Sequence, residues 1–356
     1  MKNNTLTERC RAALAKLSRR ENLERFETES IFDAMLLDKD RPLPEEDSVL
    51  LGCLSTVLAI KGETVDELVG AARGMRRHAE RIQVLGSPVV DIVGTGGDML
   101  QTFNVSTTSA FVAAGAGLVV AKHGNRSVSS RCGSADVLET CGVNMDLPPD
   151  RVEEIVAKIG IGFLFAQRFH PSMRRVAPLR KILKMRTIFN LLGPLTNPTG
   201  APCIILGVYD APLTEMFAHA LHELGCRRAM VVHGYDGMDE LTITSRSRVT
   251  ELTEGRMRTY DFFPELYFDG ELAAPSELIG GDAVENAEIL KGILDGSVYG
   301  AKRNIVLLNA GAAIYCADKA VSIEDGIRKA AESIDSGAAA EKLYRLIEMT
   351  NQTTLL

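Results

Sequence analysis

The first 80 residues have the hydrophobic spacing of helices and show no strand-like alternation. Their apolar positions recur three and four residues apart, as in Leu50, Leu51, Leu54, Val57 and Leu58. Thr64 is followed three residues later by Glu67, which is the pattern of a capping box at the start of a further helix. The spacing therefore predicts an all-helical N-terminal segment.

The pattern changes at Pro88. Residues 89–93 form a short β-rich run that ends in Gly94, and residues 106–115, after the next loop, have the composition of a capped helix. Residues 118–121 form a second apolar run that contains two valines. Strand, helix and strand in this order predict a parallel βαβ unit.

The second half of the chain repeats this alternation. Further strands are predicted over residues 203–209, 228–232 and 304–308. A helix is predicted over residues 210–224, with Asp210 as its N-cap. Residues 150–200 have a helical pattern that gives way to a loop around residues 193–198. The chain as a whole is therefore predicted to be an α/β protein.

Several polar segments follow directly on predicted strands. They begin at Gly94, Lys122, Gly234 and Asn309. Parallel strands run the same way, so the loops after them open on one edge of the sheet, where ligands of open α/β sheets bind. We therefore expect these four segments to face one cleft.

Composition and charge narrow the class of protein. The chain has 356 residues, of which 46% are hydrophobic and 24% are charged. This length favours two compact units, and the composition excludes a disordered, collagenous or fibrous chain. With 40 Lys and Arg against 47 Asp and Glu, the formal charge is −7, which disfavours the wrapping of nucleic acid over the whole surface.

Targeting and redox features predict a cytoplasmic protein. The longest apolar run, residues 110–121, is too short to span a bilayer, and the N-terminus lacks the apolar core of a secretory signal. The cysteines are scattered and form no Cys-x-x-Cys pair: Cys10, Cys53, Cys132, Cys141, Cys203, Cys226 and Cys316. We therefore expect reduced, individually buried thiols and no membrane partner.

Two segments are candidates for binding phosphate. Residues 94–98 have the sequence Gly-Thr-Gly-Gly-Asp, whose glycines let backbone N–H groups approach an anion; a tight turn is the alternative. Residues 102–108 place hydroxyl and amide side chains around a helix start, where they suit phosphate oxygens or Mg²⁺. Plain N-capping by Ser106 or Thr107 is the alternative there.

Three further candidates carry charge. The basic loop at residues 122–126 suits phosphate, whereas an isolated basic loop is more often a solvated turn. Asp239 and Glu240 together suit Mg²⁺, and a solvated acidic pair is the alternative. Arg180 has the planar fork that binds a carboxylate, or forms a surface salt bridge, and a lone His170 is more often structural.

Taken together, these segments closely resemble the anthranilate phosphoribosyltransferases. The matching motifs fall in family order, at residues 94–98, 102–107, 122–126, 133–139, 186–198, 237–241 and 305–313. The match covers about residues 30–345, and such a series is far more specific than any single glycine motif. Cys132 stands where the family pattern more often has Ser.

The resemblance implies a fold and an assembly. The fold is a small all-helical N-terminal domain beside a larger α/β domain with a mostly parallel central sheet. The helical domain would comprise residues 1–85 with added helices from about residues 175–200, and the α/β domain residues 86–174 and 201–356. The active cleft would lie between the domains, and a homodimer would form through the helical domain.

The resemblance also implies a reaction, with Mg²⁺ as cofactor. The amine of anthranilate attacks C1 of phosphoribosyl pyrophosphate, and pyrophosphate leaves. The product is N-(5-phosphoribosyl)anthranilate, an intermediate of tryptophan biosynthesis.

The resemblance assigns the binding residues by position. Phosphoribosyl pyrophosphate would be bound by Gly94, Gly97, Asp98, Thr102, Asn104, Val105, Ser106, Thr107, Lys122, His123, Gly124, Asn125, Arg126, Ser127, Val128, Ser129, Ser130 and Ser134. Anthranilate would be bound by Gly94, Asn125 and Arg180. Mg²⁺ would be bound by Ser106, Asp239 and Glu240. No general base is assigned, because a neutral arylamine is already nucleophilic; His123 and His170 are candidates.

Two other functions stay open on the sequence alone. A pyrimidine nucleoside phosphorylase shares the implied architecture, but it uses inorganic phosphate and does not need the acidic pair for metal. A nucleic-acid-binding relative without catalysis is disfavoured by the charge of −7 and by the intact acidic pair. We therefore expect small-molecule substrates and no nucleic-acid partner.

Overall fold

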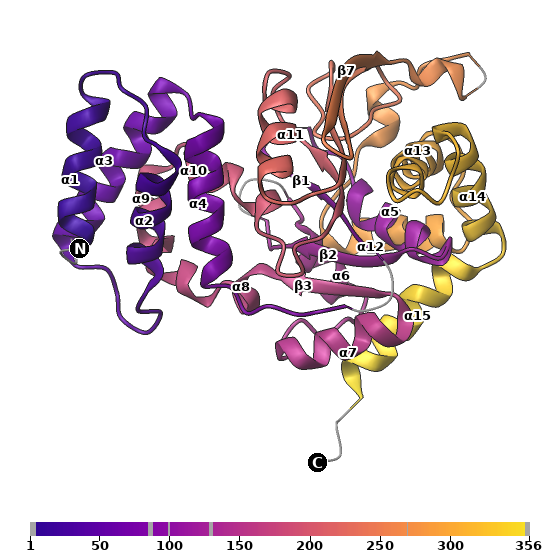
Figure 1. The fold of residues 1–356 in the computed structure, drawn as a ribbon. Coiled ribbons are helices and arrows are strands. Elements are labelled where there is room, and N and C mark those ends of the chain that lie inside the picture. The colour runs from indigo at the N-terminus through magenta and orange to yellow at the C-terminus, as the bar shows by residue number, and fades with distance from the viewer. Residues whose placement is uncertain (1–4, 85–87, 99, 128–130, 269, 353–356) are drawn as a thin grey trace.

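The computed structural model describes residues 5–84, 88–98, 100–127, 131–268 and 270–352. A group of helices lies beside a larger unit built on a sheet (Figure 1). The helical group begins with α1 (Leu6–Leu17), α2 (Arg25–Leu36), α3 (Glu45–Lys61) and α4 (Val65–Arg77). It is joined later in the chain by α9 (Ala177–Leu183) and α10 (Ile188–Leu191). The prediction that the first 80 residues are helical is confirmed.

The start of α4 shows how the sequence sets a helix boundary. The Thr64 hydroxyl accepts the Glu67 N–H at 3.3 Å, and the Glu67 carboxylate accepts the Thr64 N–H at 2.8 Å, which is the predicted capping box. Glu67 is fully buried, and its oxygens also accept the Leu23 N–H and the Lys61 ammonium, each at 3.0 Å. One side chain therefore starts α4 and ties it to neighbouring segments.

The sheet has the strand order β3-β2-β1-β4-β5-β6-β7 within the described residues. Its strands are β1 (Val89–Gly94), β2 (Val119–Gly124), β3 (Ile161–Phe165), β4 (Cys203–Gly207), β5 (Arg228–Gly234), β6 (Ser247–Thr253) and β7 (Arg256–Phe262). Neighbours from β3 to β5 are parallel, and β6 and β7 add an antiparallel pair at one edge. The predicted βαβ unit and the mostly parallel sheet are confirmed.

Helices cover both faces of the sheet. Successive strand residues point to opposite faces, so Ile205 of β4 belongs to the apolar cluster that contains α5 (Val105–Gly115), whereas Ile204 belongs to the cluster that contains α11 (Leu213–Glu223). The α5 face is completed by α6 (Ser134–Thr140), α12 (Ala283–Leu294), α13 (Ala301–Cys316), α14 (Ile323–Asp335) and α15 (Ala338–Asn351). Helix α7 (Pro149–Ile159) packs along β3 and contributes to apolar clusters on both faces. On the α11 face, one apolar cluster continues into the helical group.

Short helical turns connect these elements. They are α8 (Ala166–Phe169) and the 3₁₀ turns at Pro171–Arg175, Gly193–Leu195, Pro264–Leu266 and Pro275–Leu278. Helix α8 and the turn at Pro171–Arg175 lead from β3 back to the helical group, and the turn at Gly193–Leu195 lies between α10 and β4. The chain therefore crosses between the two parts of the fold more than once.

The strand predicted over residues 304–308 is wrong, because these residues lie within α13. Residues 305–314 are buried without interruption. A helix that is buried on every side has no polar face, so its apolar run is indistinguishable from that of a buried strand. Asn309 therefore lies in the middle of a helix and not in a loop at the sheet edge.

Three other details differ from the sequence-based expectation. The sequence pattern predicts helices and a loop over residues 150–200. The structure has a strand, β3, within this range, and all five of its residues are buried. The antiparallel strands β6 and β7 were not predicted. Helix α11 begins at Leu213 with Pro212 as its N-cap, and Asp210 contributes only its carbonyl, which accepts the Leu213 N–H at 3.1 Å.

All of the cysteines are free, and the structure corrects one expectation about them. Six are buried, as predicted, but Cys53 is exposed on α3. In the described ranges, we find no helix with the length and apolarity needed to cross a membrane.

The close crossing of α2 and α4 leads us to expect that added volume at Gly70 lowers stability. A Cβ atom at Gly70 would lie 2.2 Å from the Arg25 carbonyl oxygen and 2.9 Å from the Glu29 nitrogen, so the two backbones approach closely at this point. We expect Gly70→Ala to lower the free energy of unfolding by about 1–3 kcal/mol, measured by urea denaturation. Gly193→Ala is the control, since its Cβ meets no atom within 4 Å. Equal stability of the two variants would contradict this close crossing.

Candidate active site

The glycine turn after β1 meets the acidic loop after β5. The Gly96 N–H donates to Asp239 Oδ2 at 2.7 Å. A Cβ at Gly94 would lie 2.3 Å from the same oxygen, and one at Gly207, where β4 ends, would lie 1.4 Å from the Asp239 carbonyl oxygen. Glycine at both strand ends therefore gives the acidic loop room to lie across the edge of the sheet. Loops after β1 and β5 converge there, as the topology predicts.

Three half-buried carboxyl groups face one another at this point. Burial, and then the charge of Asp98, raise the pKa of Asp239 to about 7. Burial, with the charges of Asp239 and Asp98, raises the pKa of Glu240 well above its usual value. Burial also raises the pKa of Asp98. Neighbouring carboxylates of this kind retain protons that a bound cation would displace.

The carboxylate oxygens of Asp239 and Glu240 are ligands that fit a hard divalent cation such as Mg²⁺. Glu240 accepts the Ser106 N–H through Oε1 at 3.0 Å, while its buried Oε2 has no hydrogen-bond partner. A buried oxygen without a partner is unfavourable unless something binds it. Among the described residues, no three His, Cys, Asp or Glu side chains form a group that holds a metal by itself. The site is therefore open, which suits Mg²⁺, since this ion keeps waters and substrate oxygens.

Lys122 brings a positive charge to the same place. It lies on β2, is almost completely buried, and its ammonium donates to the Ile92 carbonyl at 2.5 Å and to Ser106 Oγ at 3.2 Å. Burial lowers the pKa of Lys122, and the charges of Asp91, Glu240 and Asp239 oppose that shift. The lysine is therefore fixed beside the acidic pair of Asp239 and Glu240.

A buried polar network lies behind Lys122. The two oxygens of Asp91 accept the His123 N–H at 3.1 Å and the Asn197 side-chain amide at 2.7 Å. Burial raises the pKa of Asp91 to about 6, although the charge of Lys122 opposes the shift. The Asn197 amide also donates to the Ala121 carbonyl at 2.8 Å. The network therefore ties β1 to β2 from inside the protein.

The start of α5 adds polar groups near the acidic pair. Asn104 donates to the Cys132 carbonyl at 3.2 Å and accepts the Asn286 amide at 3.1 Å. It is the N-cap of α5 but makes no side-chain capping bond, and no such bond from Ser106 or Thr107 caps this helix. Of the remaining candidates, Val105 and Thr107 lie in the first turn of α5, and Thr102, shortly before it, forms a bridge to Ile279. Gly97 belongs to the glycine turn after β1 and has a φ of 81°.

Several residues in and directly after the basic segment 122–126 form contacts within the protein. Arg126 forms ion pairs with Asp136 at 3.1 Å and with Glu139 at 2.7 Å, so its charge is already balanced. The Ser127 N–H donates to Asp136 at 3.0 Å, and the Ser134 hydroxyl donates to the Asn125 carbonyl at 3.2 Å, close to Gly124. The candidates Val128, Ser129 and Ser130 lie outside the described residues.

The two candidate histidines form a buried pair. Their ring centroids are 5.2 Å apart, His123 Nδ1 donates to the Gly193 carbonyl at 3.1 Å, and His170 Nε2 donates to the Thr196 carbonyl at 3.0 Å. Burial lowers the pKa of His123 to about 3 and that of His170 to about 4. Both rings are neutral near pH 7 and are weak proton acceptors, so neither is set up as a strong general base.

Arg180 lies apart from these contacts, in the last turn of α9. Its guanidinium stands over the Phe189 ring at 6.0 Å and forms no ion pair with the described residues. Burial lowers its pKa. The alternative of a surface salt bridge is therefore not observed, and the guanidinium keeps its capacity to bind a carboxylate.

Arg186 is a functional candidate that the sequence motifs do not single out. Its guanidinium donates to the Gly97 carbonyl and stands 4.1 Å from the centroid of the Tyr209 ring. It therefore links the segment between α9 and α10 with the glycine turn. The only signal was its place as the first residue of the recognised motif at residues 186–198.

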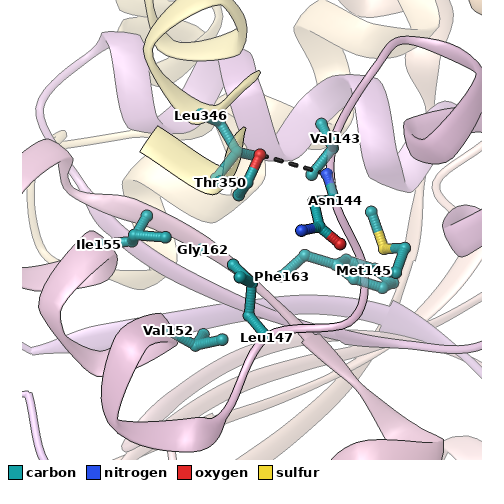
Figure 2. Close-up of a pocket in the computed structure, with 10 residues that line it drawn as sticks. All are labelled: Val143, Asn144, Met145, Leu147, Val152, Ile155, Gly162, Phe163, Leu346 and Thr350. Atoms are coloured by element: carbon teal, nitrogen blue, oxygen red, sulfur yellow. Dashed lines mark hydrogen bonds between the residues drawn. The ribbon is translucent and has the colours of Figure 1, made fainter. Parts of the chain in front are cut away.

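A separate cavity lies on the far side of β3, between α7 and α15 (Figure 2). Its volume is about 10 Å³, which is room for one water molecule. The Asn144 N–H donates to the Thr350 hydroxyl at 3.2 Å beside it, and most of the other lining side chains are apolar. None of the candidate site residues lines this cavity.

Comparisons with known proteins agree on one family. Residues 11–79 match the model of the helical bundle domain of the glycosyl transferase family, and residues 86–340 match the model of its a/b domain. An anthranilate phosphoribosyltransferase from Desulfosudis oleivorans is 52% identical over 337 residues, which cover 95% of this chain and 97% of that protein. One from Geobacter sulfurreducens is 47% identical, with coverage of 96% and 99%.

Solved structures give the same result. The crystal structure of anthranilate phosphoribosyltransferase from Thermus thermophilus has a TM-score of 0.88 and 41% identity, and the match covers 96% of this chain and 99% of that one. The Saccharomyces cerevisiae enzyme in complex with PRPP and Mg has a TM-score of 0.86 and 27% identity, with coverage of 96% and 98%. On its domains, its sequence and its fold, the chain belongs to the anthranilate phosphoribosyltransferases of the glycosyl transferase family.

Proposed function

We propose that this chain transfers the 5-phosphoribosyl group from phosphoribosyl pyrophosphate to the amine of anthranilate, with release of pyrophosphate, in tryptophan biosynthesis. The observation that carries the proposal is the convergence of Lys122, Asp239, Glu240 and the glycine turn on one edge of the sheet. A polyanionic sugar phosphate needs such a combination of a cation, a metal site and a glycine turn that its oxygens can approach closely.

Mg²⁺ is the cofactor of this reaction. Asp239, Glu240 and the Ser106 hydroxyl are the groups that would hold it, because Glu240 has a buried oxygen without a partner and Lys122 already orients that hydroxyl. When bound, the ion neutralises part of the pyrophosphate charge and so makes pyrophosphate a better leaving group.

The residues of the chain perform the other tasks of the reaction. As the bond between C1 and the pyrophosphate oxygen breaks, negative charge builds on the leaving group, and Lys122 and the positive end of α5 stabilise it. Positive charge builds on the ribose at the same time. The attacking arylamine needs no strong base when it is neutral, so the protein contributes mainly by holding it in line with C1. Asn125 and Arg180 are the proposed positioning groups for anthranilate.

Product formation tests the proposed function directly. We expect the purified chain to consume anthranilate, followed by its fluorescence, and to release equimolar pyrophosphate only when phosphoribosyl pyrophosphate and Mg²⁺ are both present. Folded protein without this activity would contradict the proposal. Phosphorolysis of thymidine or uridine without Mg²⁺ would instead identify a nucleoside phosphorylase.

The acidic pair should control the metal dependence. We expect Asp239→Asn combined with Glu240→Gln to lower kcat/KM by about 100-fold or more and to raise the Mg²⁺ concentration at half-maximal rate, because the pair supplies the charge that holds the ion. The control is Glu332→Gln with Asp335→Asn, which removes the same charge from the exposed surface of α14. A normal Mg²⁺ titration of the first variant would show that the pair does not bind metal.

Arg180 should affect anthranilate more than the sugar phosphate. Arg180→Ala removes a guanidinium that forms no ion pair within the described part of the chain, so we expect the KM for anthranilate to rise by roughly 10- to 100-fold, as for a lost charged hydrogen bond. The KM for phosphoribosyl pyrophosphate should change far less. Lys181→Ala, on the exposed face of the same helix, is the control in steady-state kinetics. Parallel changes in both KM values would remove Arg180 from the anthranilate site.

We also propose a homodimer through the helical domain. Helices α3 and α9 touch, since a Cβ at Gly52 of α3 would lie 3.1 Å from Leu179 Cδ1 of α9. Together with Met185, which follows α9 and contacts Thr56 of α3 at 3.9 Å, they expose an apolar patch. We call it the α3–α9 patch; it consists of Val49, Cys53, Ile60, Ile182 and Met185. Isolated exposed apolar side chains are common, but a group of this kind on one face favours an interface.

Light scattering with size-exclusion chromatography tests the dimer. Ile60 and Ile182 are 78% and 77% exposed in the single chain, so a charge at each would be buried without a partner in the dimer. We expect Ile60→Asp with Ile182→Asp to give a folded monomer, while Val321→Asp, at a position 91% exposed in the α/β unit, leaves the dimer intact. A dimeric double variant would place the interface elsewhere.

The domain division is part of the same proposal. Residues 1–85 with helices from about residues 175–200 would form the helical domain, and residues 86–174 and 201–356 the α/β domain. Support comes from Leu179 of α9 and Ile188 of α10, which share one apolar cluster with α2, α3 and α4.

A further inference from the structure

Asn309 makes a buried contact whose role the proposed reaction does not yet explain. It lies in the middle of α13, within the motif at residues 305–313, and is 2% exposed. Its Oδ1 accepts the Leu241 N–H at 3.1 Å, and its Nδ2 donates to the Leu241 carbonyl at 2.8 Å. Nδ2 also donates to the Ile305 carbonyl of its own helix at 2.9 Å. One side chain therefore satisfies both backbone groups of a single residue.

That residue directly follows the acidic pair. Leu241 is completely buried, so its peptide groups need partners inside the protein, and Asn309 supplies both. On the other side of the pair, the Gly96 N–H fixes the Asp239 carboxylate. The Asp236 carboxylate accepts the Thr242 hydroxyl at 2.6 Å and braces the loop internally. The contact from Asn309 attaches this loop to α13, while Glu240 attaches it to the start of α5 through the Ser106 N–H.

Helix α13 is itself held firmly in place. A Cβ at Gly311 would lie 2.6 Å from the Ile327 nitrogen, so α13 and α14 cross with their backbones nearly in contact. The Val306 carbonyl accepts the Ser109 hydroxyl of α5 at 3.4 Å. Because α5 also carries Ser106, one rigid helix contacts both segments that supply the candidate metal ligands.

We propose that Asn309 is a positioning residue that holds Asp239 and Glu240 in register with Ser106, so that the three groups meet one cation. The proposal rests on the proposed function and deepens it, because it assigns a part in metal binding to a residue that cannot touch the metal. Asparagine suits this task since its amide accepts from an N–H and donates to a carbonyl at once. Aspartate has nearly the same shape but cannot donate, and it would place a charge against two carbonyl oxygens.

The test compares Asn309→Asp and Asn309→Ala with Ser333→Ala in the full chain. Ser333 is equally buried on α14 and donates to the Val112 carbonyl at 2.8 Å, away from the acidic loop. It therefore controls for the loss of a buried hydrogen bond in the same core. Thermal unfolding shows whether each variant is folded and how much stability it loses.

Metal binding is measured without turnover, by titration of Mn²⁺ in the presence of inorganic pyrophosphate, followed by electron paramagnetic resonance. We expect both Asn309 variants to bind Mn²⁺ roughly tenfold more weakly, and Ser333→Ala to bind it normally despite a comparable loss of stability. In kinetics, the Mg²⁺ concentration at half-maximal rate should rise in parallel, while the KM for anthranilate stays close to that of the parent.

Normal Mn²⁺ binding by either folded Asn309 variant would overturn the proposal, and so would equally weak binding by Ser333→Ala. Asn309→Ala adds no charge and is the variant to rely on if Asn309→Asp does not fold. Failure of the proposed function gives a different result, since the parent chain would then lack anthranilate-dependent pyrophosphate release while the Mn²⁺ comparison still decides the role of Asn309.

Discussion

The site depends on opposite charges that are desolvated together at one edge of the sheet. Burial raises the pKa values of Asp239 and Glu240 and lowers that of Lys122, and the attraction between opposite charges opposes the shifts of Glu240 and Lys122. The carboxyl groups nevertheless outnumber the lysine, so the protein alone retains protons that a divalent cation would displace. The cation balances this excess of negative charge, and its remaining coordination positions are open to the oxygens of a polyanionic substrate.

Glycine residues at two strand ends make this arrangement possible, because they have no Cβ atom. At Gly94 and Gly207 the acidic loop occupies the space of a Cβ atom, so the carboxylates come within reach of the turn after β1. Glycine loses more conformational freedom on folding than other residues, and interactions elsewhere must offset that cost. The buried contacts of Asp91 with Asn197 and with the backbone of His123 are one such set, since they join the adjacent strands β1 and β2.

The sequence predicts the parts of this protein in which a local pattern carries the information. Hydrophobic spacing identifies the N-terminal helices, and the order of strand and helix identifies the βαβ unit. Charged and hydroxyl residues at strand ends, such as Lys122 and Asp239, show their chemistry directly and do converge. By contrast, β3 and α13 are buried on all sides, so their periodicity is lost. The role of Arg186 was missed because its partner Gly97 lies 89 positions away.

The misassignment of residues 304–308 bears on function as well as on fold. At the end of a parallel strand, Asn309 would face the ligand, and its amide would be read as a substrate contact. Within α13 the same amide is sealed inside the core, where it must pair with backbone, and it does so with the residue after Glu240. A polar residue inside an apolar run therefore signals either a ligand or an anchor for a distant loop. Only the type of element decides between them, and here the helix makes Asn309 an anchor.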